Sequence, residues 1–174
     1  MGENNKFILI ISSLTFLSIA CHNQKAFQTT NTFSSFAGSW NLISRIDKTS
    51  TGKIVAESTL GSDPISLLMY DTLGNVSVQI MRRERNDSTT AKNVEQNSNN
   101  SAAFNGYDAY FGTYIIDSFN HQVKHHIQGT ISQKDVGREL IRNYSISGDT
   151  LLLWFTTTNT NVTVTRTLTL VRKK

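Results

Sequence analysis

Hydrophobic and polar residues alternate one by one along most of the chain after Gly38. The last segment shows this most clearly, because Val162, Val164, Leu168 and Leu170 alternate with threonines. Successive side chains of a β-strand point to opposite faces, so a period of two predicts strands with one buried face. Turn-forming stretches separate the segments, for example at residues 71–75, 118–121 and 147–149.

The pattern predicts eight antiparallel strands joined by short turns, and no amphipathic helix of usable length follows residue 21. Eight such strands close into an up-and-down barrel that leaves no exposed edge and can enclose one small ligand. The expected fold class is therefore all-β. In the first strand, the alternation assigns Trp40, Leu42 and Ser44 to one face and Ile43 and Arg45 to the other.

The first 20 residues differ from this pattern and are typical of a secretory signal. Lys6 precedes an apolar stretch at residues 7–17, which is shorter than the ~20 residues that a membrane-spanning helix needs. The chain's single cysteine, Cys21, directly follows Ala20, as the lipidated cysteine of a bacterial lipoprotein does. We therefore expect residues 1–20 to be removed and Cys21 to be lipidated.

This assignment predicts the domain organisation and the location. Residues 21–35 are polar and aperiodic and are expected to tether a β-barrel domain at 36–174 to the membrane. His22 stands where an aspartate would signal retention in the inner membrane. The expected location is therefore the bacterial outer membrane, with the protein facing the periplasm.

Composition and charge exclude several function classes. Charged residues make up 17% of the chain, and the formal net charge of +4 is mostly spread along the sequence. No nucleic-acid-binding signature accompanies that charge, so nucleic acid is not expected as a partner. A single cysteine excludes an intramolecular disulfide framework. No cofactor motif is found, and a monomer is expected.

One segment interrupts the alternation. Residues 86–101 are rich in Asn, Ser and Thr and contain almost no apolar residue, which predicts a long mobile loop. The segment is interpreted either as a lid over a barrel mouth or as a surface insertion, which costs little loop-closure entropy.

Four stretches carry recognisable motifs: GSWNL at 38–42, GNVSVQIMR at 74–82, AAFNGYDAYFGTY at 102–114, and VKHHIQG at 123–129 followed by VG at 136–137. Together they resemble the bacterial lipocalin-like domain family over about residues 38–171. The resemblance implies a lipocalin-type barrel that binds a small, largely apolar molecule. The 86–101 segment departs from the family, whose members usually have a shorter link there.

The resemblance also implies a structural pair. In lipocalins an arginine of the final strand stacks over the tryptophan of the G-x-W motif and closes the barrel base. Arg166 shares the apolar face of the last segment, so the expected pair is Arg166 over Trp40.

Two further arginines lie on apolar faces and are candidate ligand contacts. Arg142 shares a face with Tyr144, and Arg82 shares one with Ile80. A buried guanidinium requires a partner, which could be a protein carboxylate or an acidic group of the ligand. Arg142 and Tyr144 are also similar to the Arg-x-Tyr pair by which fatty-acid-binding barrels hold a carboxylate. The alternative is an arginine at the barrel rim with a snorkelling stem.

Three aromatic or imidazole side chains complete the expected lining. His125 and His126 point to opposite faces of one strand, so they cannot chelate a metal together, and no metal site is expected. His125 is expected to hydrogen-bond inside the barrel and could line a pocket. Tyr110 and Tyr114 flank Gly112 on one face, which indicates either a slot for a flat ligand or a packing solution.

Three functions stay open at this point. The first is a lipid-anchored binding protein for a small, largely apolar ligand, with or without an acidic group. The second is a small barrel enzyme of the isomerase or cyclase type, with His125 as general acid or base. The third is a structural envelope protein with a packed barrel. No nucleophile–base motif supports the enzyme.

Overall fold

The structure is a computed structural model that describes residues 33–57, 59–85, 103–159 and 162–174. The expected signal, Cys21 and the 86–101 loop therefore lie outside the described residues. Within the described part of the chain, no helix is long and apolar enough to cross a membrane.

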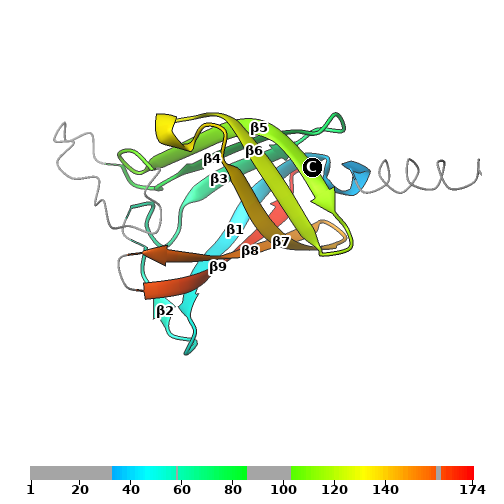
Figure 1. Ribbon diagram of the computed structural model, residues 1–174. Coiled ribbons are helices and arrows are strands. Elements are labelled where there is room, and N and C mark those ends of the chain that lie inside the picture. The colour runs from blue at the N-terminus through cyan, green and yellow to red at the C-terminus, as the bar shows by residue number, and fades with distance from the viewer. Residues whose placement is uncertain (1–32, 58, 86–102, 160–161) are drawn as a thin grey trace, which may run out of the picture.

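The strands form one closed antiparallel barrel (Figure 1). They are β1 (Gly38–Thr49), β2 (Ile54–Val55), β3 (Ile65–Tyr70), β4 (Asn75–Met81), β5 (Tyr107–Asp117), β6 (Gln122–Thr130), β7 (Glu139–Ser147), β8 (Thr150–Asn159) and β9 (Val162–Arg172), with a 3-10 turn, η1 (Gln133–Asp135), between β6 and β7. Sequential neighbours from β3 to β9 pair with each other, and β1 pairs with both β3 and β9. The eight-stranded up-and-down barrel predicted from the alternation is confirmed. The two-residue β2 adds a ninth strand that pairs only with the far end of β1.

A β-bulge in β1 changes which of its side chains face the interior. Leu42 pairs with Leu170 of β9 and Ser44 pairs with Thr169, so Ile43 is an extra residue and lies 61% exposed. Beyond this residue the inward positions shift by one, and Arg45 becomes buried. The prediction that Arg45 shares a face with Ile43 is therefore wrong, because a bulge resets the period-two pattern.

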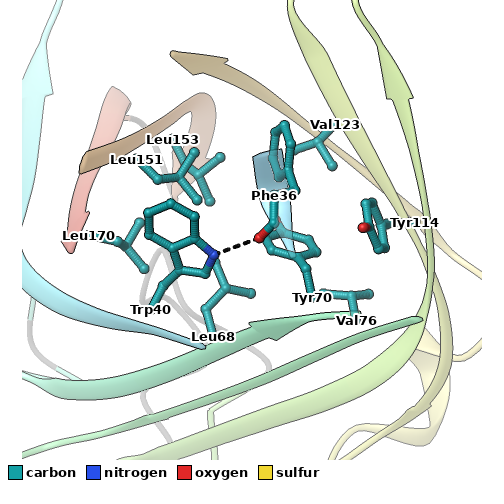
Figure 2. Close-up of a cluster of buried hydrophobic side chains, with 10 residues drawn as sticks. All are labelled: Phe36, Trp40, Leu68, Tyr70, Val76, Tyr114, Val123, Leu151, Leu153 and Leu170. Atoms are coloured by element: carbon teal, nitrogen blue, oxygen red, sulfur yellow. Dashed lines mark hydrogen bonds between the residues drawn. The ribbon is translucent and has the colours of Figure 1, made fainter. Parts of the chain in front are cut away.

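A short helical turn at residues 33–36 closes one end of the barrel. Phe36 is fully buried, and its ring packs edge-on against Tyr70 and Tyr144 at centroid distances of 5.2 and 4.8 Å. The indole Nε1 of Trp40 donates to the Phe36 carbonyl oxygen at 2.8 Å, as Figure 2 shows. Phe33, which was assigned to the tether, also packs on this end, with its ring 5.2 Å from that of Tyr114.

The expected stacking of Arg166 over Trp40 is wrong, because Arg172 occupies that place. The Arg172 guanidinium carbon lies 4.1 Å from the centre of the Trp40 ring. The β1–β9 register pairs Trp40 with Arg172, whereas it pairs Asp47 with Arg166. Arg172 also donates to the carbonyl oxygens of Ser35 and Ala37, so it ties the helical turn to the barrel base. The prediction therefore has the correct strand and the correct face, because Arg166 and Arg172 share one face of β9, but it has the wrong residue along that strand.

We call the packed rings of Phe36, Tyr70, Tyr114 and Tyr144 at this end of the barrel the aromatic plug, and we predict that Phe36 contributes most of its stability. Phe36→Ala removes a fully buried ring and should lower the free energy of unfolding by about 3–5 kcal/mol. Phe119→Ala removes the same group from a turn where it is 92% exposed and should change stability by less than about 0.5 kcal/mol. Urea unfolding of both variants measures the difference, and equal losses would contradict the role of the plug.

Candidate functional site

A cavity of about 80 Å³ lies inside the barrel, displaced from the aromatic plug toward the opposite end. Its apolar lining residues are Leu42, Leu68, Val78, Ile80, Leu153, Phe155, Leu168 and Leu170. Its polar lining residues are Arg45, Ser66, Asp108, Tyr110, His125, Arg142 and Arg166. Such a mixed wall suits a ligand with one polar and one apolar part.

Two of the cavity arginines are neutralised by protein carboxylates. Asp47 and Arg166 are opposite each other on β1 and β9, and two guanidinium nitrogens each donate to an Asp47 oxygen at 2.8 Å. Arg45 donates to Glu57 at 3.2 Å, and both of these side chains are 3% exposed. Glu57 also accepts hydrogen bonds from the backbone N–H groups of Thr59 and Leu60, so this ion pair fastens the β2–β3 connection to the barrel.

Arg142 differs because none of the described carboxylates pairs with it. It lies on β7, and its guanidinium carbon is 3.7 Å from the centre of the Phe155 ring on the adjacent strand β8. It also donates to the Ile141 carbonyl oxygen at 3.1 Å. Burial lowers the pKa of Arg142, which reflects the cost of holding this charge in the barrel. Arg142 is half-buried, and its charge interacts with that of Asp108 across the cavity, so it is a cation that can accept a further anionic partner.

Two further polar atoms of the cavity wall lack hydrogen-bond partners among the described residues. They are Nη2 of Arg45 and Oδ1 of Asp108, and both are buried. Burial raises the pKa of Asp108, with nearby Asp135 acting in the same direction. Arg142 and Arg166 act in the opposite direction and lower the pKa of Asp108. The cavity wall therefore combines three guanidinium groups with one carboxyl group that has no ion-pair partner among the described residues.

His125 lies between two tyrosines on the cavity wall. Its Nε2 is 2.8 Å from the Tyr70 hydroxyl, and its Nδ1 is 2.9 Å from the Tyr110 hydroxyl. Burial, reinforced by Arg142, lowers the pKa of His125 to about 3, so the ring is neutral at physiological pH. The expected interior hydrogen bonding of His125 is confirmed. Both ring nitrogens are engaged by protein groups, which leaves neither free to act on a substrate.

Three of the six residues expected to contact a ligand line the cavity, namely Arg142, His125 and Tyr110. The other three do not. Tyr144 and Tyr114 belong to the aromatic cluster at the plugged end, where the Tyr114 hydroxyl donates to the Asp71 carbonyl oxygen. Arg82 lies just beyond β4 and donates to the Thr59 carbonyl oxygen at 3.0 Å.

Two predictions about the lining are wrong. In the described part of the chain, Arg142 does not pair with Tyr144, and the slot expected beside Gly112 is filled. Tyr144 lies one step further toward the plug and packs on Phe36, so the hydroxyl near Arg142 is that of Tyr110. A Cβ at Gly112 would lie only 1.9 Å from the His126 carbonyl oxygen, so backbone already fills that space. Gly112 adjoins the second bulge, where the β5–β6 register shifts.

Sequence reasoning missed Arg45, Asp47, Glu57 and Asp108 as inward-facing polar groups. The β1 bulge hides the first two, and a carboxylate that follows a two-residue strand gives no periodic signal. The alternation predicts that the strand of Asp108 starts only at Tyr110, two residues later, whereas in the structure this strand begins at Tyr107. No group of three or more histidine, cysteine or acidic side chains in the described ranges is placed to hold a metal ion.

We predict that the neutral, buried His125 makes folding stability depend on pH. Its pKa is about 3 in the folded state and about 6.5 in an unfolded chain, so between these values only the unfolded state binds the proton. This contribution is complete above pH 6.5 and is lost as the pH falls toward 3, by up to about 1.4 kcal/mol per pH unit. Urea unfolding between about pH 5 and 7 should show a steeper loss for the native protein than for His125→Gln. Equal slopes would show that the histidine is not held neutral.

Residues 37–173 match a protein family described as lipocalin-like domain. A search of curated proteins found no match. The matched range begins just before β1 and ends just after β9, so it includes every strand of the barrel and all residues of the cavity wall. The chain therefore belongs to the lipocalin-like domain family.

Proposed function

We propose that the protein binds a small ligand through an acidic group in the barrel cavity, and that it does so as a lipoprotein on the periplasmic side of a bacterial outer membrane. The observation that carries the proposal is the Arg142 guanidinium, which lines the cavity and has no carboxylate partner among the described residues. A ligand carboxylate supplies the missing counter-charge and fits the planar fork of an arginine.

The size of the cavity limits the ligand. At about 80 Å³ it is smaller than the ~150 Å³ cavity that admits benzene and far below the ~300 Å³ of common ligand pockets. The apolar wall formed by Leu68, Val78 and Leu153 leaves room for a few carbon atoms beyond the acidic group. The ligand class that fits is therefore a short-chain carboxylic acid.

The alternatives receive less support. A general acid or base needs a ring nitrogen that can reach the substrate, and both nitrogens of His125 face tyrosine hydroxyls instead. A barrel with a purely structural role has no need of an uncompensated guanidinium, whose burial is costly.

The position of the N-terminal turn supports an orientation on the membrane. Residues 33–36 close one end of the barrel (Figure 1). The lining residues place the cavity toward the other end. Cys21 precedes Phe33 by 12 residues, so a lipid anchor at Cys21 would keep the plugged end nearer to the membrane than the cavity end. The cavity end would then face the periplasm.

We predict that short carboxylates bind and that Arg142 is responsible. Isothermal titration of butyrate into the purified protein should show saturable binding, and Arg142→Met should weaken it by about tenfold or more, as expected for one charged hydrogen-bonding partner. Arg83→Met serves as the matched control, because Arg83 is exposed and paired with Asp63 outside the cavity. Butyrate affinity that is equal in the Arg142 and Arg83 variants would contradict the proposal.

We predict that Cys21 is the mature N-terminus and carries acyl chains. Each buried CH₂ of an acyl chain contributes ~0.8 kcal/mol, so two or more chains hold the protein on a membrane. Mass spectrometry of the protein from membranes of a bacterial host should show loss of residues 1–20 and lipid on Cys21, and Cys21→Ser should abolish both. An unmodified Cys21 in a fully processed protein would exclude the lipoprotein assignment.

A further inference from the structure

The hydrogen bonds of His125 can run in only two ways. A neutral imidazole has one N–H donor and one acceptor nitrogen. Because the two nitrogens face the hydroxyls of Tyr70 and Tyr110, one tyrosine must donate to the ring and the other must accept from it. The choice decides which tyrosine retains a hydroxyl proton for another partner.

In the first arrangement Nε2–H donates to Tyr70, and the Tyr70 proton then needs a further acceptor. Tyr70 is 3% exposed, does not line the cavity and is packed between the rings of Phe36 and Tyr114. Its only hydrogen-bond partner in the described part of the chain is His125 itself. This arrangement therefore leaves a buried O–H donor unsatisfied, which native proteins avoid.

In the second arrangement Tyr70 donates to Nε2, and Nδ1–H donates to the Tyr110 oxygen. Tyr110 lines the cavity, so its own hydroxyl proton can be directed into that space. The positive charge of the neighbouring Arg142 also interacts favourably with the Tyr110 oxygen. With its oxygen accepting from Nδ1–H, the Tyr110 hydroxyl is left as a donor to whatever occupies the cavity.

We infer that Tyr70, His125 and Tyr110 form a hydrogen-bond relay with one direction, in which Tyr110 is left as a donor to the ligand. The cavity then selects a ligand head group that presents one acceptor atom to Arg142 and a second acceptor atom to Tyr110. A carboxylate offers two acceptor oxygens, one toward Arg142 and one toward Tyr110. A primary amide of the same shape places an NH₂ against one of these donors and is rejected. The selectivity part of this inference rests on the proposed ligand site, whereas the relay itself does not.

The direction of the relay can be measured without a ligand. Nitrogen-15 NMR distinguishes the Nδ1–H tautomer from the Nε2–H tautomer, and the His125 signals are assigned by their loss in His125→Gln. We expect His125 to be the Nδ1–H tautomer at neutral pH. The Nε2–H tautomer, or a ring protonated on both nitrogens, would overturn the relay whether or not any ligand binds.

The selectivity is tested by Tyr70→Phe, which removes only the hydroxyl that donates to Nε2 and preserves the packed ring. Tyr110 is then free to donate to the imidazole, so the preference for butyrate over butyramide should fall by about tenfold. Tyr107→Phe is the control, because the Tyr107 hydroxyl contacts Gln79 outside the cavity and its loss should not change the preference.

The outcomes separate the two proposals. A preference that is unchanged in Tyr70→Phe would overturn the relay as the source of selectivity while butyrate binding still supports the proposed function. If neither compound binds the native protein, the proposed function fails, and the tautomer of His125 still decides the direction of the relay.

Discussion

The compensation of buried and half-buried guanidinium groups is the constraint on which the interior of this barrel depends. A charge removed from water requires a partner, and the structure meets this condition differently at each level of the barrel. Arg172 stacks on Trp40 and donates to backbone carbonyls at the plugged end. Arg166 and Arg45 are paired with carboxylates further along. Arg142 is held by an aromatic face and one carbonyl oxygen, and it borders the cavity.

The change of arginine partners along the barrel divides its interior into two parts. Around Phe36 and Trp40, rings and aliphatic side chains pack into one buried cluster, and the helical turn at 33–36 covers that end. Beyond the level of His125, charged groups replace the rings and a cavity remains. The packed part gives stability, and the polar part, whose groups are held by ion pairs and by the tyrosine–histidine contacts, is arranged in advance for a ligand.

The sequence contained most of the information for the architecture and only half of that for the site. Period-two alternation predicted the closed barrel because every strand has one buried face, and it placed His125 and Arg142 inside. It failed at Arg45 because a single extra residue, Ile43, inverts the pattern without any local signal. It also could not set the register between β1 and β9, which pairs Trp40 with Arg172 rather than Arg166. Distances along a strand, unlike faces, depend on pairing with a partner that lies far away in the sequence.

The central claim is that the uncompensated charge of Arg142 receives an acidic ligand inside the barrel. A crystal structure of the protein with 4-bromobutyrate tests it most directly, because the anomalous signal of bromine locates the ligand independently of the protein density. The account predicts the carboxylate within hydrogen-bond distance of Arg142 and Tyr110 and the bromine against the apolar wall. A bromine signal only on the outer surface, with Arg142 still stacked on Phe155 beside an unchanged cavity, would contradict it.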